Sequence, residues 1–412
     1  MTGIAITGVG PVTPIGVGSV EFQEAWVAGR SGIAQITRFD ASDLAVTIAG
    51  EVDIDPTDWL SRRDLATVDR FTVLAFAAAS LAIEDSGFLR SGQDTDRVGV
   101  FLATGGAGLS TWEETTETLW TKGPQHIGPR VIPKSMANNA AAFMSMKFGL
   151  RGPSVTTVSA CASGSDAIVA AAHSLGAGEC DVAVVGGAEA PVTPATVSGF
   201  AQMRALSRRN DSPVQACRPF DVDRDGFVIG EGAGVMVLER EDIAAARGAR
   251  VYARLIGHGR ASDAYHVTAP HPEGGGAALA MRRALASANL QPTDVDYVNA
   301  HGTGTVLNDS SEAQALHQVF GAGGARVTVS STKGHTGHLI GAAGAVEAIV
   351  CAQVFDVDLL PSTANLTHPD PAFNLDLVAL HARPAHPQTV MSTSNAFGGH
   401  NVAVLLGRPE VA

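Results

Sequence analysis

The sequence has little positive charge and few cysteines. Its 412 residues include 28 Lys and Arg against 41 Asp and Glu, which gives a net charge of −13. Nucleic-acid-binding proteins need a basic face, so this balance argues against DNA or RNA as a ligand. Any acidic partner must instead dock on a local basic patch. The four cysteines, at positions 161, 180, 217 and 351, show no C-x-x-C spacing and fit a reduced, cytoplasmic protein better than a disulfide scaffold.

The sequence also has no obvious membrane or targeting segment. No apolar run reaches the roughly 18 residues that a spanning helix needs. Residues 1–10 lack a basic region followed by a clean apolar stretch, so no signal peptide is expected. With 45% apolar and 17% charged residues, the chain has the composition of a soluble globular protein with a large core.

Apolar, β-branched runs alternate with amphipathic segments along the chain. This alternation predicts an α/β fold with mostly parallel sheets covered by helices on both faces. The rhythm repeats after about residue 255, which predicts two duplicated halves, 1–255 and 256–412. Strands are expected at 234–238 and 253–257, as neighbours, and 390–393 with 402–406 should form a hairpin.

The most informative stretch is Ser-Ala-Cys-Ala-Ser-Gly-Ser at 159–165. It lies between a predicted strand and a predicted helix, which places Cys161 at a turn where helical N–H groups are unpaired. Those donors and the helix dipole favour a thiolate, so we expect a lowered pKa and a nucleophilic Cys161. A lone cysteine is more commonly a buried structural residue. The two histidines described next favour the interpretation of Cys161 as a nucleophile.

Two histidines follow predicted strands in the second half. His301 begins His-Gly-Thr-Gly-Thr, and His338 ends Lys-Gly-His-Thr-Gly-His at 333–338. The carboxyl ends of parallel strands are where such sheets place their sites. The spacing of His335 and His338 could indicate zinc, but no third ligand has supporting spacing, so no metal is expected.

Two other motif matches fail. Residues 221–226 resemble a calcium loop, but its twelfth position is Gly232 where a bidentate Glu is needed. The glycine-rich stretch 230–234 precedes a strand and does not link a strand to a helix, so it is not a dinucleotide loop.

With Cys161, His301 and His338 together, the chain resembles the β-ketoacyl-acyl carrier protein synthases. The elongating, type II branch fits best, including the ketosynthases of polyketide assembly. The resemblance covers essentially the whole chain and includes the motifs Arg-Pro-Phe-Asp at 218–221 and Phe-Gly-Gly at 397–399. It implies a thiolase-like fold, in which the two halves form a five-layer αβαβα sandwich, and a dimer, either a homodimer or a heterodimer with a chain-length subunit.

The resemblance also implies a mechanism. Cys161 takes an acyl group from the phosphopantetheine of an acyl carrier protein, and malonyl on the carrier then enters. His301 and His338 donate hydrogen bonds to the malonyl thioester oxygen while carbon dioxide leaves. The enolate attacks the acyl group, whose oxygen the N–H groups of Cys161 and Phe397 stabilise. No cofactor is bound permanently.

Supporting roles follow from motif positions. Lys333 would have an orienting role and pair with Glu312, with Asp309 nearby. Phe397 would be the gate between the acyl pocket and the malonyl site. The positions that would line the pantetheine arm are Thr268, Thr303 and Thr305. Asn299 and Glu347 match positions that sometimes hold a structural cation; since Thr393 replaces the usual Asn partner, that ion is left open.

Several positions depart from the family pattern. Asn395 stands where an aromatic is expected, and Trp112 occupies what should be the acyl-pocket wall, where it would shorten the pocket. In the carrier-docking helix Arg62 and Arg63 remain, but residues 66 and 67 are Ala and Thr where basic residues are common. These changes favour a specialised ketosynthase with a dedicated carrier, in polyketide rather than housekeeping fatty-acid synthesis.

Other functions share some of these features. A degradative thiolase needs a second catalytic cysteine, but Cys351 lies in an apolar helix and looks structural. A starter-type synthase pairs its cysteine with His and Asn, which the His338 motif argues against. A silent chain-length subunit would lack Cys161, and a cysteine hydrolase would not need the second histidine. A ketosynthase that is active only in a heterodimer stays open.

Overall fold

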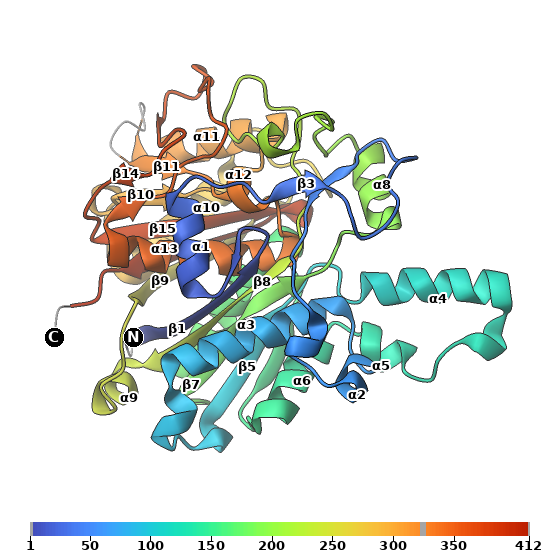
Figure 1. Cartoon of the computed structure of the whole chain (residues 1–412). Helices are drawn as coiled ribbons and strands as arrows, with labels where there is room; N and C mark the ends of the chain where they lie inside the picture. Colours follow the sequence, from blue (N-terminus) through green and yellow to red (C-terminus); the bar gives the residue numbers. More distant parts are fainter. Residues whose placement is uncertain (1–2, 322–326, 411–412) are drawn as a thin grey trace.

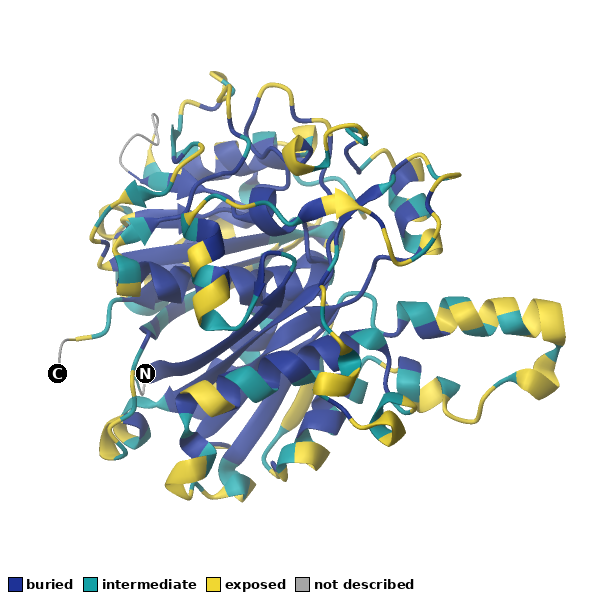
Figure 2. Ribbon diagram, viewed as in Figure 1, coloured by how far each residue is buried: buried dark blue, intermediate teal, exposed yellow. Residues whose placement is uncertain are grey.

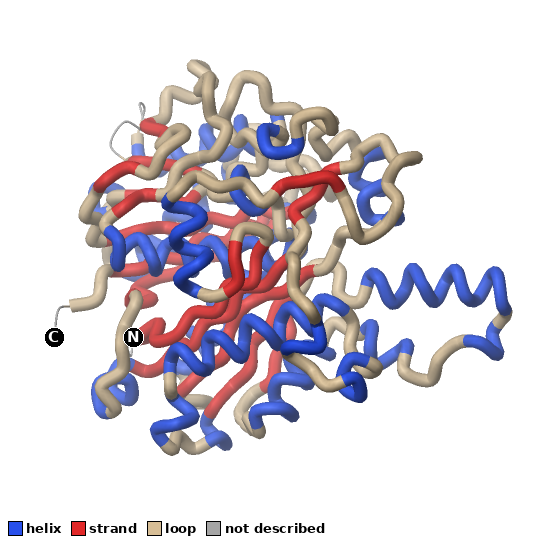
Figure 3. Tube along the Cα trace, viewed as in Figure 1, coloured by secondary structure: helices blue, strands red, loops and turns tan. Residues whose placement is uncertain are grey.

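The structure is a computed structural model that describes residues 3–321 and 327–410 (Figure 1). The main strands are β1 (Ile4–Thr13), β2 (Gly16–Val17), β5 (Val98–Ala103), β6 (Ser154–Thr157), β7 (Val182–Glu189), β8 (Gly232–Arg240), β9 (Ala253–Ser262), β10 (Tyr297–Asn299), β11 (Thr328–Ser330), β13 (Asp376–Leu377), β15 (Thr389–Ala396) and β16 (His400–Gly407). Within the described ranges they form a twelve-stranded sheet in the order β13-β11-β10-β15-β16-β9-β1-β8-β7-β5-β6, with β2 paired to β1 (Figure 3). Two short ribbons pair β3 (Ile33–Gln35) with β4 (Ile48–Gly50) and β12 (Leu359–Leu360) with β14 (Arg383–Pro384).

The two ends of the large sheet repeat one pattern. β5 is parallel to β6 and β7, and β7 is antiparallel to β8; β10 is parallel to β11 and β15, and β15 is antiparallel to β16. The duplication and the hairpin at 390–406 are therefore as predicted. The strands at 234–238 and 253–257 are not neighbours, because β1 pairs with β8 on one side and β9 on the other. The proposed division at residue 255 falls within β9.

Helices cover the sheet in layers. The helices of the body are α1 (Ser19–Val27), α3 (Arg70–Ser86), α6 (Asn139–Phe148), α7 (Ser163–Gly176), α8 (Pro194–Gln202), α9 (Glu241–Ala246), α10 (Gly275–Ala288), α11 (Val306–Phe320), α12 (Lys333–Thr336) and α13 (Ala343–Val357). α3 and α6 pack on the first half and α10 on the second, with α11 against α10. α7 and α13 contact each other and strands of both halves. The result is the five-layer αβαβα arrangement expected of a thiolase-like fold.

The central helix is unusually apolar. Residues Ile340–Val357 have a mean hydropathy of 1.6, long and apolar enough by composition to span a membrane, and 89% of the segment is buried within the protein. The prediction that no such run exists was wrong. A helix enclosed between two sheet halves is hydrophobic all round, which accounts for the run.

A hairpin-like arm extends from the body (Figures 1 and 2). It consists of α4 (Leu109–Lys122), a short turn at Pro124–His126 and α5 (Val131–Ser135), and it returns near α2 (Arg62–Leu65). Trp120 on α4 is 81% exposed. The arm therefore leaves large apolar side chains uncovered on the single chain.

Candidate active site

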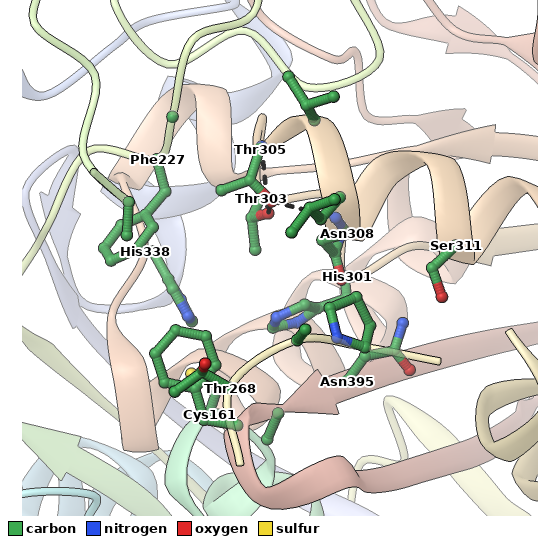
Figure 4. Close-up of a pocket in the computed structure, with 18 of the residues that line it drawn as sticks. Cys161, Phe227, Thr268, His301, Thr303, Thr305, Asn308, Ser311, His338 and Asn395 are labelled. Atoms are coloured by element: carbon green, nitrogen blue, oxygen red, sulfur yellow. Dashed lines mark hydrogen bonds between the residues drawn. The ribbon is translucent and has the colours of Figure 1, made fainter. Parts of the chain in front are cut away.

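Three side chains from distant parts of the sequence meet in one cavity (Figure 4). The Sγ atom of Cys161 and ring nitrogens of His301 and His338 all lie within 4.8 Å of one another. Cys161 lies on the 3₁₀ turn Ala160–Ala162 before α7, His301 follows β10, and His338 follows α12. Since β10 and β11 are parallel neighbours, the loops after them open at the same edge of the sheet.

The turn that carries Cys161 has an unusual backbone. Ala160 has a φ of +50°, and the Ser163 hydroxyl accepts from the N–H of Ser159, which stabilises the turn. The turn is compact because Gly164 packs directly on α13, where an added Cβ would lie 2.7 Å from a backbone nitrogen.

Burial raises the pKa of the Cys161 thiol to about 12, against the opposing effects of Lys333 and of the N–H groups of Phe397 and Cys161. The expectation of a lowered thiol pKa is therefore corrected. In the buried site the cost of desolvating a thiolate exceeds the stabilisation by nearby donors. The N–H groups of Cys161 and Phe397 nevertheless both lower the thiol pKa through hydrogen bonding to Sγ. They therefore lie close to where an oxyanion of the bound acyl group would form.

His301 is held as one neutral tautomer. The Nζ of Lys333 lies 3.3 Å from its Nδ1 and donates to its carbonyl oxygen at 2.6 Å. An ammonium group can only donate, so Nδ1 of His301 is an acceptor and its proton is on Nε2. Burial, then Lys333 and His338, place the His301 pKa well below its ordinary value of 6.5. His301 is thus a neutral hydrogen-bond donor.

His338 stands edge-on to His301, with ring centroids 5.2 Å apart and planes at 85°. Its backbone N–H donates to the carbonyl oxygen of Val228 at 2.7 Å, and Phe227 packs against its ring. Burial and the charge of Lys333 hold the His338 pKa well below 6.5. Two neutral imidazoles therefore face the thiol.

Lys333 forms an ion pair with Glu347. The expected pair of Lys333 with Glu312 is therefore wrong. α13 brings Glu347 to the inside of the α12 turn, so its carboxylate is the one that reaches the ammonium. Glu312 instead holds the loop that carries His301, because its two oxygens accept from the N–H groups of His301 and Gly302, each at 2.7 Å. Burial raises the pKa of Glu312 to about 7, although these N–H donors oppose the rise.

Asp309 supports the same loop one turn earlier on α11. It accepts from the N–H of Gly304 at 3.2 Å and from the N–H of Phe220 at 2.8 Å. Burial raises its pKa, and those donors limit the rise. Glu312 and Asp309 are therefore positioning residues that fix the loop behind His301.

The cavity has a volume of about 290 Å³ and opens toward solvent. Thr268, Thr303 and Thr305 all line it, as expected for a polar arm such as pantetheine, and the Thr303 and Thr305 hydroxyls are 3.0 Å apart. Phe397 also lines it, followed by Gly398 and Gly399, whose φ angles of +81° and +74° suit glycine.

Trp112 is not on the wall of this cavity. It lies in the first turn of α4, is 47% exposed and does not line the space around Cys161. α4 extends away from the body of the protein (Figure 1). The expectation that Trp112 shortens or redirects the acyl pocket within its own chain therefore finds no support in the lining of this cavity and stays a prediction.

Sequence reasoning missed two groups. Phe200 and Phe227 form an aromatic wall beside Phe397 and His338. Phe227 directly follows the stretch 221–226 in the sequence and could have been found there. Glu189 is fully buried and accepts from the N–H groups of Gly106 and Gly341, both at 3.0 Å. It ties the loop after β5 to the start of α13, and no sequence motif marked it.

Two groups of buried side chains carry donor atoms of the kind that ligate cations. At Asn299 both side-chain polar atoms, with Oε2 of Glu347 and Oγ of Ser392, are buried without a partner among the described residues. The oxygens among these atoms are of the type that ligates a structural cation, but Glu347 already pairs with the Lys333 ammonium, so a cation at Asn299 and Glu347 stays an untested prediction. The cluster of Cys161, His301 and His338 has the donor atoms of a metal site. There the adjacent Lys333 ammonium would repel a metal ion.

The chain is similar to known proteins over nearly its whole length. The sequence profile of "Beta-ketoacyl synthase, N-terminal domain" matches residues 1–244, and that of the C-terminal domain matches residues 252–367. The chain is 43% identical to 3-oxoacyl-[acyl-carrier-protein] synthase 2 of Synechocystis sp. over 97% of both chains, and 42% identical to that of Coxiella burnetii over 98% of both.

Solved structures of ketosynthases are also similar to this chain over its full length. The ishigamide ketosynthase/chain length factor has a TM-score of 0.94 at 33% identity, over 99% of both chains. A type II polyketide ketosynthase in complex with its acyl-carrier protein has a TM-score of 0.92 at 29% identity, over 99% of this chain and 100% of that one. Fold, site and full-length similarity agree, and the chain belongs to the β-ketoacyl synthase family.

Proposed function

We propose that this protein condenses an acyl group with malonyl-acyl carrier protein, giving a β-ketoacyl-acyl carrier protein and carbon dioxide. The observation that carries this proposal is the convergence of one thiol and two neutral imidazole donors within 4.8 Å. One nucleophile and two fixed hydrogen-bond donors are what a two-step transfer followed by decarboxylation requires.

In the first step the sulfur of Cys161 attacks the carrier thioester. A carbon–sulfur bond to Cys161 forms, the bond to pantetheine breaks, and the thiol proton passes to the departing pantetheine sulfur. The N–H groups of Cys161 and Phe397 stabilise the oxyanion. Because the resting thiol is protonated, this transfer needs no free thiolate beforehand.

In the second step malonyl loses carbon dioxide. The electron pair of the breaking bond forms an enolate, whose oxygen accepts hydrogen bonds from Nε2 of His301 and from a ring N–H of His338. The enolate carbon then attacks the acyl group, the bond to Cys161 breaks, and the released thiolate takes up a proton from water, to which the cavity is open. Lys333 keeps His301 in the donating tautomer, and the aromatic wall of Phe200 and Phe227 favours loss of the carboxylate charge.

The partner is the acyl carrier protein, and the substrates arrive on its phosphopantetheine. One relative's structure holds such a carrier and others hold a chain length factor. For this chain we propose a dimer through the exposed arm and the β6 edge, and a cytoplasmic location. Cys161 and both histidines lie in one chain, so a complete catalytic set does not depend on a chain-length partner.

The test is mass spectrometry of the protein after incubation with acyl-carrier protein, followed by malonyl-carrier. We expect a mass gain on the peptide with Cys161, then its loss with release of carbon dioxide. Chain length on the carrier separates fatty-acid from polyketide elongation. A chain that never becomes acylated would rule the proposal out.

A further inference from the structure

Glu189, the last residue of β7, carries a buried carboxylate that the proposed catalytic cycle does not use. Its side chain is fully buried and forms no ion pair in the part of the chain that the structure describes. A buried carboxylate without a cation is unfavourable, because the charged form loses its hydration. Other groups must therefore supply the missing stabilisation.

Four hydrogen-bond donors surround the carboxylate of Glu189. One oxygen accepts from the N–H of Gly106 at 3.0 Å and from the hydroxyl of Thr104 at 3.1 Å. The other oxygen accepts from the N–H groups of Gly105 and Gly341, the latter at 3.0 Å. A protonated carboxyl would need an acceptor, and backbone N–H groups can only donate. The donors therefore hold Glu189 as an anion, although burial raises its pKa.

The surroundings of Glu189 repeat those of the catalytic cavity with the two halves exchanged. The cavity joins the turn before α7 to the loops after β10 and β15, while the site of Glu189 joins the turn before α13 to the ends of β5 and β7. The turns Ala160–Ala162 and Ile340–Ala342 both begin with a residue at positive φ, +50° and +47°. By this correspondence Gly341 occupies the place that Cys161 has in the first half. Glu189 thus places an anion where the catalytic half would hold the oxyanion of the reaction.

A short series of contacts leads from Glu189 to the nucleophile. The N–H of Gly341 donates to Glu189, and a Cβ added at Gly164 would lie 3.1 Å from the carbonyl oxygen of Gly341. Gly164 is in the first turn of α7, directly after the turn of Cys161. Ile340 lines the catalytic cavity and has a positive φ that β-branched residues rarely adopt. Such a backbone persists only where its surroundings hold it, and Glu189 holds the next residue.

We propose that Glu189 is a positioning residue for the nucleophile: its carboxylate fixes the turn at 340–341 against the turn of Cys161, and its charge opposes a free thiolate before the substrate arrives. The inference rests on the proposed function. Burial has the largest effect on the Cys161 thiol and raises its pKa; of the charged side chains, Lys333 lowers this pKa and Glu189 raises it. A thiol that is still protonated can pass its proton to the departing pantetheine sulfur.

The experiment compares two reactions of Cys161 in the full chain, acylation by acyl-carrier protein and alkylation by iodoacetamide at pH 8. Glu189→Gln keeps the shape of the side chain, but its NH₂ group cannot accept from the N–H groups that it faces. We expect the maximal rate of acylation to fall at least tenfold, because loss of one fixed oxyanion donor costs about 10²–10³-fold and a displaced donor costs less. The carrier concentration for half the maximal rate should not change. Alkylation should become severalfold faster, because a nearby negative charge is lost.

Two further variants separate the charge of Glu189 from its anchoring role and from stability. Thr104→Val removes one donor and keeps the charge, so acylation should slow severalfold while alkylation keeps the wild-type rate. Glu239→Gln removes another fully buried carboxylate, which binds Thr7 and Arg247 and does not line the cavity. It should lower stability in urea unfolding and leave both reactions of Cys161 unchanged.

Four results would overturn the inference. Glu189→Gln could acylate at the wild-type maximal rate, or Glu239→Gln could slow acylation equally. Faster alkylation in Thr104→Val would show that a loosened turn, and not a lost charge, exposes the sulfur. If Glu189→Gln does not fold, Thr104→Val decides, and a wild-type acylation rate there contradicts the anchoring role. A wild-type protein that the carrier does not acylate would instead remove the proposed function, while the alkylation rates would still test the charge of Glu189.

Discussion

The ammonium of Lys333 lies 3.3 Å from Nδ1 of His301 and donates to the carbonyl oxygen of the same residue. This contact fixes which ring nitrogen of His301 holds the proton, and so decides that His301 presents a donor to the substrate. Both imidazoles are kept neutral by burial and by the same lysine.

Removing either histidine should separate the two half-reactions. In His301→Ala and His338→Ala we expect acylation of Cys161 to continue, because the oxyanion donors of that step are backbone N–H groups. Decarboxylation of malonyl-carrier should fall by about 10²-fold or more, as for loss of one fixed oxyanion donor. Mass spectrometry of acyl-Cys161 and carbon dioxide release check this. Equal losses in both steps would contradict it.

Removing Lys333 should destabilise the fold as well as slow the reaction. Lys333→Met leaves Glu347 charged and buried, and breaking such a pair costs about 3–5 kcal/mol. The double variant K333M/E347Q should recover most of this stability but not the decarboxylation rate, because His301 loses its tautomer partner. Urea unfolding and carbon dioxide release are the measurements. The prediction fails if the double variant is as unstable as the single one.

Alkylation of Cys161 should depend steeply on pH. Since its thiol pKa is raised to about 12, the thiolate fraction rises about tenfold per pH unit between pH 7 and 10. We expect the rate of reaction with iodoacetamide to follow this slope without a plateau. Cys161→Ser is the control for the remaining cysteines, all of which are buried. A plateau near neutral pH would show that a thiolate forms there after all.

His258 should make the protein sensitive to acid. Its ring packs 4.9 Å from that of His173, and burial, then His173 and Arg260, lower its pKa from 6.5 to about 4. Above pH 6.5 His258 is unprotonated in both the folded and the unfolded protein. Between pH 6.5 and 4 the unfolded chain binds the proton before the folded chain does. The free energy of unfolding therefore decreases as the pH is lowered, by about 1–2 kcal/mol after allowance for solvent screening.

The check on His258 is urea unfolding of wild type and His258→Asn at pH 7.5 and pH 5. The loss of stability on acidification should be smaller in the variant. His381→Asn, at an exposed histidine whose side chain makes no ion pair among the described residues, is the control and should keep the wild-type pH dependence. An unchanged pH dependence in His258→Asn would contradict the prediction.

The sequence alone was enough for the architecture and for finding the three side chains that we propose to react. Alternating apolar runs and the repeat after residue 255 indicated duplicated α/β halves, because strand and helix periods are local properties of the chain. The small residues around Cys161 and the glycine-rich turns at His301 and His338 marked the three groups, since these turns need particular residues in consecutive positions.

Tertiary structure decided what depends on burial and on long-range contacts. It gave Lys333 the carboxylate of Glu347 in place of Glu312, raised the thiol pKa of Cys161, and left Trp112 outside the lining of the cavity. Desolvation and pairing between distant segments exist only once the halves have packed, so no local pattern encodes them.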